Sequence, residues 1–188
     1  MFKQIRSLLS DEGEGPLSGD VEADETFSGG KPRAHVNKSR SAAALRKYEV
    51  KSSIFGMAER GGSVRAWVVA DRKKPTLHGM IRDYALPQSM IFTDEYRPYV
   101  GIERHFQGHR RIRHRAGIYV QGEIHTNTIE GFFGLFKNGV RGVYHSVSAK
   151  YLQSYLDEYS FRYNRRDSRQ PMFWAMLNRV QKASRASS

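Results

Sequence analysis

Three acidic residues, far apart along the chain, have the chemistry needed to cut a phosphodiester bond together. Asp24 interrupts a β-like run, Asp94 ends the apolar run SMIFTD, and Glu130 lies in the segment HTNTIEGFFGLFK. Hard cations such as Mg²⁺ prefer carboxylate oxygens as ligands. Two such ions, about 3.5–4 Å apart, activate the attacking oxygen and offset charge on the leaving oxygen. We therefore predict a two-metal site in which Asp24 bridges the ions.

The segment around Glu130 has the periodicity of an amphipathic helix. At about 100° per residue, Asn127, Glu130 and Lys137 fall on one polar stripe with Gly134 in its middle. The opposite stripe is apolar and consists of Ile129, Phe132, Phe133 and Phe136. Such a helix packs its phenylalanines against a sheet and leaves its polar stripe free. Lys137, on the side of Glu130, is expected to hold a DNA phosphate as a point charge.

Each of these residues also has an ordinary structural interpretation. Asn127 followed three residues later by Glu130 matches a capping box, which needs no metal. Asp24 alone could be a solvated residue at a strand edge, and Asp94 alone could belong to a turn or a helix cap. His125, just before the helix, is more often a structural hydrogen-bonding residue than a metal ligand. The combination of the three carboxylates favours the metal site.

The elements that must position these residues are short strands followed by helices. Four runs have the composition of strands: VEADETF, KSSIFGMAE, SVRAWVVAD and SMIFTD. Gly61-Gly62 indicates a hairpin turn between the second run and the third. Helices are expected to begin near Pro75, Asn127, Ser148 and Pro171. The order predicts an α/β fold, with a mixed central sheet flanked by helices and a helical C-terminal part.

The charge of the chain predicts a polyanionic partner. Its 188 residues include 31 Lys and Arg against 19 Asp and Glu, which gives a formal net charge of +12. Nucleic acid is the commonest partner of so basic a surface. The arginine-dense segment 104–115 is expected to follow a phosphate backbone, with a solvated loop as the alternative. The residues that we expect to contact DNA are Lys31, Arg33, Arg97, Arg110, Arg111, Arg113, Arg115 and Lys137.

Other features exclude whole classes of protein. The chain has no cysteine, so it contains no disulfide and no thiolate zinc site. No stretch approaches the roughly 20 apolar residues that cross a bilayer, and the N-terminus lacks the pattern of a signal peptide. We therefore expect a cytoplasmic protein with no membrane partner.

Three blocks of the sequence resemble a known family, the ISXO-like insertion-sequence transposases of the DDE superfamily. The blocks are VEADETFSGGK, IFTDEYRPY and residues 125–166, and the resemblance runs from about Gly19 to Arg166. It implies an RNase H-like fold, dependence on Mg²⁺ with Mn²⁺ as the usual substitute, and DNA cleavage with strand transfer at transposon ends. It also implies a bacterial protein associated with the nucleoid.

The resemblance carries roles over to individual residues. Asp24 and Asp94 match the first two acidic positions, Glu130 the third, and Lys137 the basic residue after it. Some members are described with asparagine as the third residue, which would be Asn127. Six residues separate Glu130 from Lys137, and this spacing favours Glu130. Asn127 would then orient a metal-bound water or a phosphate.

The resemblance also implies partners and boundaries. The partners are double-stranded DNA, as transposon ends and as target, and further copies of the chain in a homodimer or higher oligomer. We expect an N-terminal helix and connector at 1–19, the RNase H-like DDE catalytic domain at 20–166, and a C-terminal helix and tail at 167–188. Relatives carry an N-terminal zinc-ribbon and DNA-binding region. We expect the chain to lack it and to recognise transposon ends weakly or not at all.

The sequence thus predicts a DNA transposase core that cleaves and joins DNA with bound metal. One alternative is an RNase H-like nuclease with similar carboxylates but no strand transfer. The other is a DNA-binding fragment derived from a transposase and without catalytic activity.

Overall fold

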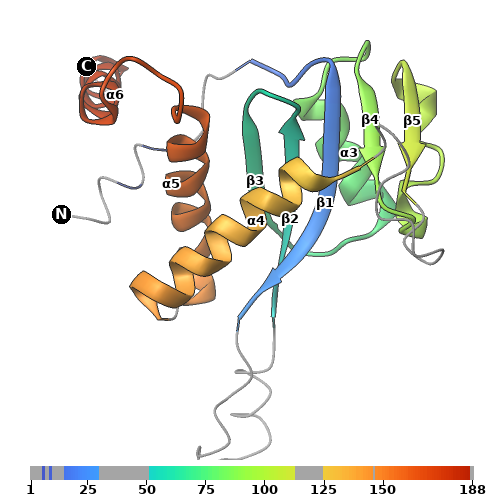
Figure 1. Cartoon of the computed structure of the whole chain (residues 1–188), viewed down its shortest axis with the longest axis horizontal. Helices are drawn as coiled ribbons and strands as arrows, with labels where there is room; N and C mark the ends of the chain where they lie inside the picture. Colours follow the sequence, from blue (N-terminus) through green and yellow to red (C-terminus); the bar gives the residue numbers. More distant parts are fainter. Residues whose placement is uncertain are drawn as a thin grey trace, which may run out of the picture.

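A mixed five-stranded sheet forms the centre of the molecule (Figure 1). The structure, a computed structural model, describes Arg6, Leu9 and residues 15–29, 51–112, 125–145 and 147–186. The strand order is β3-β2-β1-β4-β5. The strands are β1 (Asp20–Ser28), β2 (Ser52–Glu59), β3 (Val64–Val69), β4 (Met90–Thr93) and β5 (Gly108–Arg111). β2 is antiparallel to both β1 and β3, whereas β1, β4 and β5 are parallel.

Helices cover both faces of the sheet. In Figure 1, α4 (Asn127–Gly139) crosses in front of β1 and β2, and α3 (Lys74–Tyr84) lies behind the sheet. α5 (Leu152–Asn164) packs beside α4, and α6 (Met172–Ala186) follows it. Short helical turns complete the chain: η1 (Arg97–Tyr99), η2 (Ile102–His105), the π-helical η4 (Val140–Tyr144) and η5 (Ala149–Tyr151).

Alternation along β1 separates two cores, because successive strand residues point to opposite faces. Val21 and Ala23 are fully buried in the core on the α3 side. Glu22 and Asp24 therefore point to the other side, where α4 and α5 cover the sheet. The apolar stripe predicted for α4 is buried there as expected, and it consists of Ile129, Phe132, Phe133 and Phe136. The polar stripe of α4 is thus presented beside the acidic residues of β1.

The strand order and directions form the RNase H-like α/β arrangement that the sequence predicts. All four expected strands are present, with the β2–β3 hairpin turning at Gly61, whose φ is +71°. The helices expected near Pro75, Asn127 and Pro171 are also present. The helix predicted within residues 1–19 falls largely outside the described residues.

A fifth strand, β5, was missed by the sequence analysis. Gly108–Arg111 lies in the basic segment 104–115, for which we predicted no strand, and it pairs with β4 from Met90–Gly108 to Thr93–Arg111. The sequence GHRR has none of the apolar alternation that marks a strand. Pairing with β4 makes it a strand, and its charges suit an edge, where they discourage further strand pairing.

The start of α5 also differs from the prediction. Ser148 precedes the short turn η5 rather than α5 itself, and its side chain makes no capping hydrogen bond. α5 begins at Leu152, directly after η5. Among the described residues, no helix is long and apolar enough to span a membrane.

α4 approaches the sheet closely because β2 carries a glycine beneath it. A Cβ at Gly56 would lie 2.7 Å from Cζ of Phe133 and 2.8 Å from Cδ1 of Ile129. Both side chains are buried in the core, so neither can move aside freely. Gly56 is also the register partner of Asp24. The close approach therefore occurs next to Asp24.

We predict that Gly56→Ala destabilises the fold by about 1–3 kcal/mol, because the added methyl overpacks this contact. Urea unfolding followed by circular dichroism measures the change. Gly79→Ala on α3 is the matched control, since a Cβ there meets nothing within 4 Å. It should be neutral or stabilising, because alanine favours a helix. Equal effects of the two substitutions would contradict the close-approach explanation.

Candidate active site

Asp24 lies within the central strand β1, on the face covered by α4. Its side chain is partly buried, and Oδ1 accepts the backbone N–H of Glu25 at 2.7 Å. Burial, together with the negative charges of Asp94, Glu25 and Glu130, raises the pKa of Asp24 to about 7, against the lowering effect of that hydrogen bond. The interpretation as a solvated edge residue is wrong. The charges of both other predicted carboxylates, Asp94 and Glu130, instead act on the pKa of Asp24.

Asp94 is the first residue after β4, the parallel neighbour of β1. Glu22 pairs with Phe92 across these strands. Asp24 and Asp94 each follow that pair by two residues, which explains why their charges interact. Oδ1 of Asp94 also accepts the backbone N–H of Tyr96 at 2.8 Å. The turn interpretation is therefore correct locally, and the turn holds Asp94 next to Asp24.

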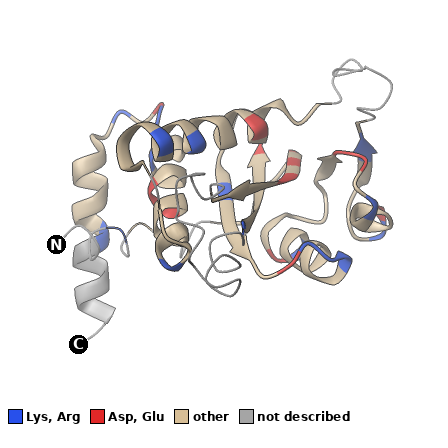
Figure 2. Ribbon diagram, turned by 90° about the horizontal axis from the view of Figure 1, so that it is seen from below, with Lys and Arg blue, Asp and Glu red and all other residues tan. Residues whose placement is uncertain are grey.

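Glu130 is exposed on the first turn of α4. One of its oxygens accepts the hydroxyl of Thr126 at 2.6 Å. Asn127, the first residue of α4, is exposed, and Lys137 is partly buried nearly two turns beyond Glu130. In Figure 2 an acidic segment lies toward the N-terminal end of α4 and basic segments lie toward its other end. The polar stripe of α4 thus carries a negative charge near the start of the helix and a positive charge near its end.

The capping-box interpretation of Asn127 and Glu130 is wrong. The residue before α4 is Thr126, and its side chain makes no hydrogen bond to the helix amides. The first-turn amides of Thr128 and Ile129 instead donate to a carboxylate of β1, that of Glu22, at 2.8 and 3.1 Å.

Sequence analysis missed Glu22, which is fully buried two residues before Asp24. Besides α4, it contacts the Arg60 guanidinium at 2.9 Å. Nδ1 of His125 lies 3.2 Å from Glu22 Oε1 without forming a hydrogen bond. That His125 is a structural hydrogen-bonding residue stays a prediction. Because the side chains of a strand alternate, Glu22 lies on the same covered face of β1 as Asp24, and a charge buried there needs partners. That signal was available in the sequence.

Glu25 was also missed, and it faces the opposite side of the sheet. The hydroxyl of Tyr99, a fully buried residue, donates to Glu25 Oε1 at 2.5 Å. Burial and the charge of Asp94 raise the pKa of Glu25 to about 7, against the lowering effects of this hydrogen bond and of the charge of Arg72. Asp94 therefore interacts with carboxylates on both faces of β1, with Asp24 on one face and Glu25 on the other.

The carboxylates match a divalent cation in charge and in donor type. Asp24, Asp94 and Glu130 come from three elements and offer oxygen ligands only. As the side chains stand, however, no group of three His, Asp or Glu residues among the described ones is close enough to hold a metal ion. Glu130 is the member most able to move, because it is exposed on a helix and bonded only locally by its carboxylate.

The predicted DNA-binding residues divide into two sets. Arg97 on η1 and both Arg110 and Arg111 on β5 are exposed, and Lys137 lies on α4. Arg97 follows β4 in the chain, β5 pairs with β4, and α4, which carries Lys137, packs on β1 and β2. The remaining predictions fall outside the described residues, and these are Lys31, Arg33, Arg113 and Arg115.

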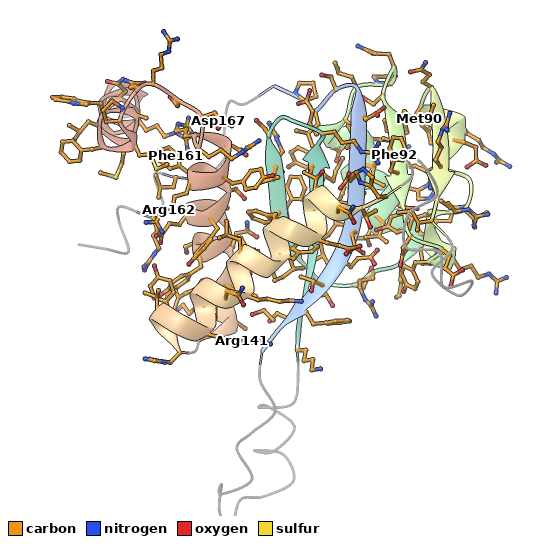
Figure 3. The ribbon with its side chains drawn as sticks, viewed as in Figure 1. Met90, Phe92, Arg141, Phe161, Arg162 and Asp167 are labelled. Carbon is orange, nitrogen blue, oxygen red and sulfur yellow. The ribbon has the colours of Figure 1, made fainter. Side chains whose placement is uncertain are left out.

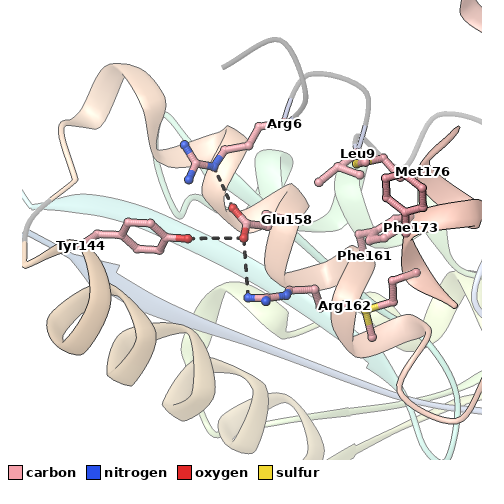
Figure 4. A pocket seen from close by; sticks show the side chains of 9 residues that line it. Arg6, Leu9, Tyr144, Glu158, Phe161, Arg162, Phe173 and Met176 are labelled. Atoms are coloured by element: carbon pink, nitrogen blue, oxygen red, sulfur yellow. Dashed lines mark hydrogen bonds and ion pairs between the residues drawn. The ribbon is translucent and has the colours of Figure 1, made fainter. Parts of the chain in front are cut away.

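A pocket of about 530 Å³ lies elsewhere, between α5, α6 and the N-terminal residues (Figure 4). Among its described lining residues the carboxylate is that of Glu158, which binds Arg6 at 2.7 Å, Tyr144 at 3.3 Å and Arg162 at 3.6 Å. The rest of its lining is apolar: Leu9, Phe161, Met172, Phe173 and Met176. Because Glu158 is already paired, the acidic cluster around Asp24 is the better candidate for chemistry.

Comparison with known proteins identifies the family of the chain. No curated protein matches the chain. A family model described as the ISXO2-like transposase domain matches residues 16–164, a range that holds the whole sheet, α4 and α5. That range includes Asp24, Asp94 and Glu130. Since the match covers most of its length, the chain belongs to the ISXO2-like transposase domain family, for which DNA is the implied partner.

Proposed function

We propose that this chain is the catalytic core of a DDE transposase, which cleaves DNA at insertion-sequence ends and joins it to a target. One observation carries the proposal. The parallel pairing of β1 with β4 brings Asp24 and Asp94 to matching positions on neighbouring strands, and the charges of Asp94 and of Glu130 on α4 help to raise the pKa of Asp24 to about 7. Like charges held near one another raise the pKa of a carboxyl group, and a bound cation would relieve that repulsion.

Asp24, Asp94 and Glu130 are the residues that would hold two Mg²⁺ ions, with Mn²⁺ as a substitute and Asp24 as the shared ligand. When bound, the ions supply an activated water and compensate charge on the leaving oxygen. Glu130 would exchange its hydrogen bond from Thr126 for the metal. The exposed Asn127 would orient the attacking water or a phosphate, and Lys137 would hold a phosphate of the bound strand.

The reaction consists of two displacements at phosphorus. In the first, a water oxygen bonds to phosphorus at the transposon end, and the 3′ oxygen leaves with a proton. In the second, the freed 3′-hydroxyl attacks a target phosphodiester, forms the new bond and releases the target's own 3′ oxygen. Joining two ends calls for at least two copies of the core, so we propose a homodimer or higher oligomer on DNA.

The acidic cluster itself would repel DNA, so basic residues around it must bind the backbone. Arg97 follows β4 on η1, and both Arg110 and Arg111 lie on β5, which pairs with β4, so we propose these residues for this task together with Lys137 on α4. Lys31, Arg33, Arg113 and Arg115 are proposed to extend the same surface. Neutralised phosphates release counterions, which makes such binding depend strongly on salt.

We expect Asp24→Asn and Asp94→Asn to lower the rate of DNA cleavage about 10²–10⁴-fold, because each removes a ligand that supplies several kcal/mol to the transition state. Nicking of a DNA substrate carrying transposon ends, with Mg²⁺ and with Mn²⁺, measures the loss. Asp157→Asn is the matched control. It neutralises a partly buried carboxylate on α5 that is hydrogen-bonded to Gln153, and it should cleave at the wild-type rate.

The same assay separates the two alternatives. Insertion of the cleaved end into a target plasmid identifies a transposase, whereas cleavage without joining identifies a nuclease. A protein that binds DNA equally well with and without Mg²⁺, and whose Asp24 and Asp94 variants behave as wild type, would be a non-catalytic fragment.

The raised pKa of Asp24 predicts how stability depends on pH in the absence of metal. The native state holds this proton up to about pH 7, whereas a free aspartate loses it near 3.8. Protonation therefore stabilises the fold fully below pH 3.8, and this contribution disappears as the pH rises through 7. Asp24→Asn should lose less stability between pH 5 and 8 than wild type, as urea unfolding in EDTA would show. Parallel pH profiles for the two proteins would disprove the raised pKa.

Substitution of the exposed arginines tests the DNA surface. Arg110→Ala and Arg111→Ala should each weaken DNA binding and reduce the salt slope of log K by about one, as expected for a single phosphate contact. Fluorescence anisotropy with labelled duplex DNA at several salt concentrations measures both quantities. Arg82→Ala, an exposed arginine on α3, is the control and should leave the slope unchanged.

A further inference from the structure

Glu22 has a buried carboxylate whose two oxygens are both saturated with donors. Oε2 accepts the amides of Thr128 at 2.8 Å and Ile129 at 3.1 Å. Oε1 accepts Arg60 Nε at 2.9 Å and the Thr128 hydroxyl at 3.0 Å, with His125 Nδ1 at 3.2 Å. A buried charge is tolerated only with such complete pairing. The contacts are therefore specific in direction and difficult to exchange.

Arg60, which follows β2, connects Glu22 to two further elements. Its second amino group donates to the carbonyl of His125 at 2.8 Å, just before α4 begins. Its guanidinium carbon lies 3.9 Å from the centre of the Phe92 ring in β4. Figure 3 shows Phe92 beside β1, with the side chains of the sheet centre around it. Glu22 and Arg60 thus touch β1, β4 and α4 at once.

These are the three elements that carry the candidate catalytic carboxylates. Glu22 precedes Asp24 by two residues, and Phe92 precedes Asp94 by two. Ile129, whose amide binds Glu22, is the residue next to Glu130. The contacts to Phe92, Thr128 and Ile129 therefore lie within two residues of a candidate catalytic carboxylate. A displacement of the backbone at any of these contacts would therefore also displace the neighbouring carboxylate.

The pair matters most for α4, because the helix has no local cap. Thr126 makes no side-chain bond to the helix amides, so Glu22 takes the place of the missing cap. A negative charge at a helix N-terminus is favourable to the helix dipole. A cap supplied by β1 also fixes where the helix starts and how it is rotated relative to the strand. This cap therefore orients the polar stripe of α4, which carries Glu130, toward Asp24.

We propose that Glu22 and Arg60 are positioning residues, which hold in place the backbone segments that carry Asp24, Asp94 and Glu130, so that a movement of the Glu130 side chain lets the three carboxylates share divalent cations. The inference rests on the proposed function, since it concerns the same site. Neither residue contacts the reacting atoms. They act by fixing the distance between β1 and the first turn of α4.

Glutamine cannot replace Glu22 in this arrangement, although its size is the same. Its amide group offers one oxygen and one NH₂ donor. If the NH₂ group took the place of Oε2, it would face the backbone N–H groups of Thr128 and Ile129. If it took the place of Oε1, it would face Arg60 Nε. Either orientation sets donors against donors. Glu22→Gln therefore releases the first turn of α4 without leaving a cavity.

The test measures Mn²⁺ binding to the protein by electron paramagnetic resonance, without DNA. Loss of a group that orients metal ligands typically lowers metal affinity roughly 10–100-fold, and we expect that range for Glu22→Gln. Amide hydrogen exchange should accelerate at Thr128 and Ile129 and not in β2 or β3. Cleavage of transposon-end DNA should fall and partly recover at high Mn²⁺ concentration, as expected when affinity for the ion is what has changed.

Two further variants guard against a general loss of folding. Glu59→Gln removes a carboxylate at the end of β2 that accepts the Ser18 hydroxyl, and it should bind Mn²⁺ as wild type does. Arg60→Lys keeps the charge but loses the planar fork that reaches Glu22 and His125 while stacking on Phe92. It should lower Mn²⁺ affinity in the same direction as Glu22→Gln but by less, even if Glu22→Gln does not fold.

The outcomes separate the inference from the proposed function. A wild-type protein that binds Mn²⁺ and cleaves DNA, with Glu22→Gln and Arg60→Lys variants that do both equally well, would overturn the positioning role alone. So would variants that are less stable in urea but bind Mn²⁺ with unchanged affinity. A wild-type protein that neither binds Mn²⁺ nor cleaves DNA would overturn the proposed function, and the inference with it.

Discussion

Carboxylates that repel one another can stay together only if the fold holds their backbones in place. Asp94 and Glu130 both act to raise the pKa of Asp24, so attraction between these side chains contributes nothing to the arrangement. Strand pairing holds the first two, since β1 and β4 are parallel neighbours. Packing holds the third, because the phenylalanines of α4 are buried against the sheet. A bound cation would relieve a repulsion that the apolar core and the backbone ladder otherwise sustain.

Packing alone would leave α4 free to slide along the sheet or turn about its axis, because apolar contacts have little directionality. Two features restrict it. Gly56 lets Phe133 and Ile129 approach the backbone of β2, and Glu22 binds the first-turn amides. The first sets the distance of α4 from the sheet, and the second sets its start and rotation. Both lie within two residues of Asp24 or of its register partner, so the positioning contacts and the site occupy the same part of the sheet.

Much of this could be predicted from the chain itself. Apolar alternation located β1 to β3, and an apolar run located β4; prolines marked the starts of α3 and α6. A period of 3.6 residues identified the buried face of α4 correctly at every one of its four residues. These signals are local, because burial of one face imposes the period of the element on its own sequence. The three carboxylates stood out for the same reason, as polar residues at positions where a strand or helix pattern made them conspicuous.

Only the tertiary structure decided the features that depend on a distant partner. β5 is a strand because β4 supplies its hydrogen bonds, and its sequence GHRR carries no apolar period of its own. The cap of α4 comes from Glu22, which is 106 residues away from Thr128, and the local pattern at Asn127 pointed to the wrong cap. A buried charge finds its partners wherever the fold brings donors within reach, and sequence spacing does not contain that distance. The chain therefore determined which residues could do the chemistry, and the packing of α4 on the sheet decided how closely they meet.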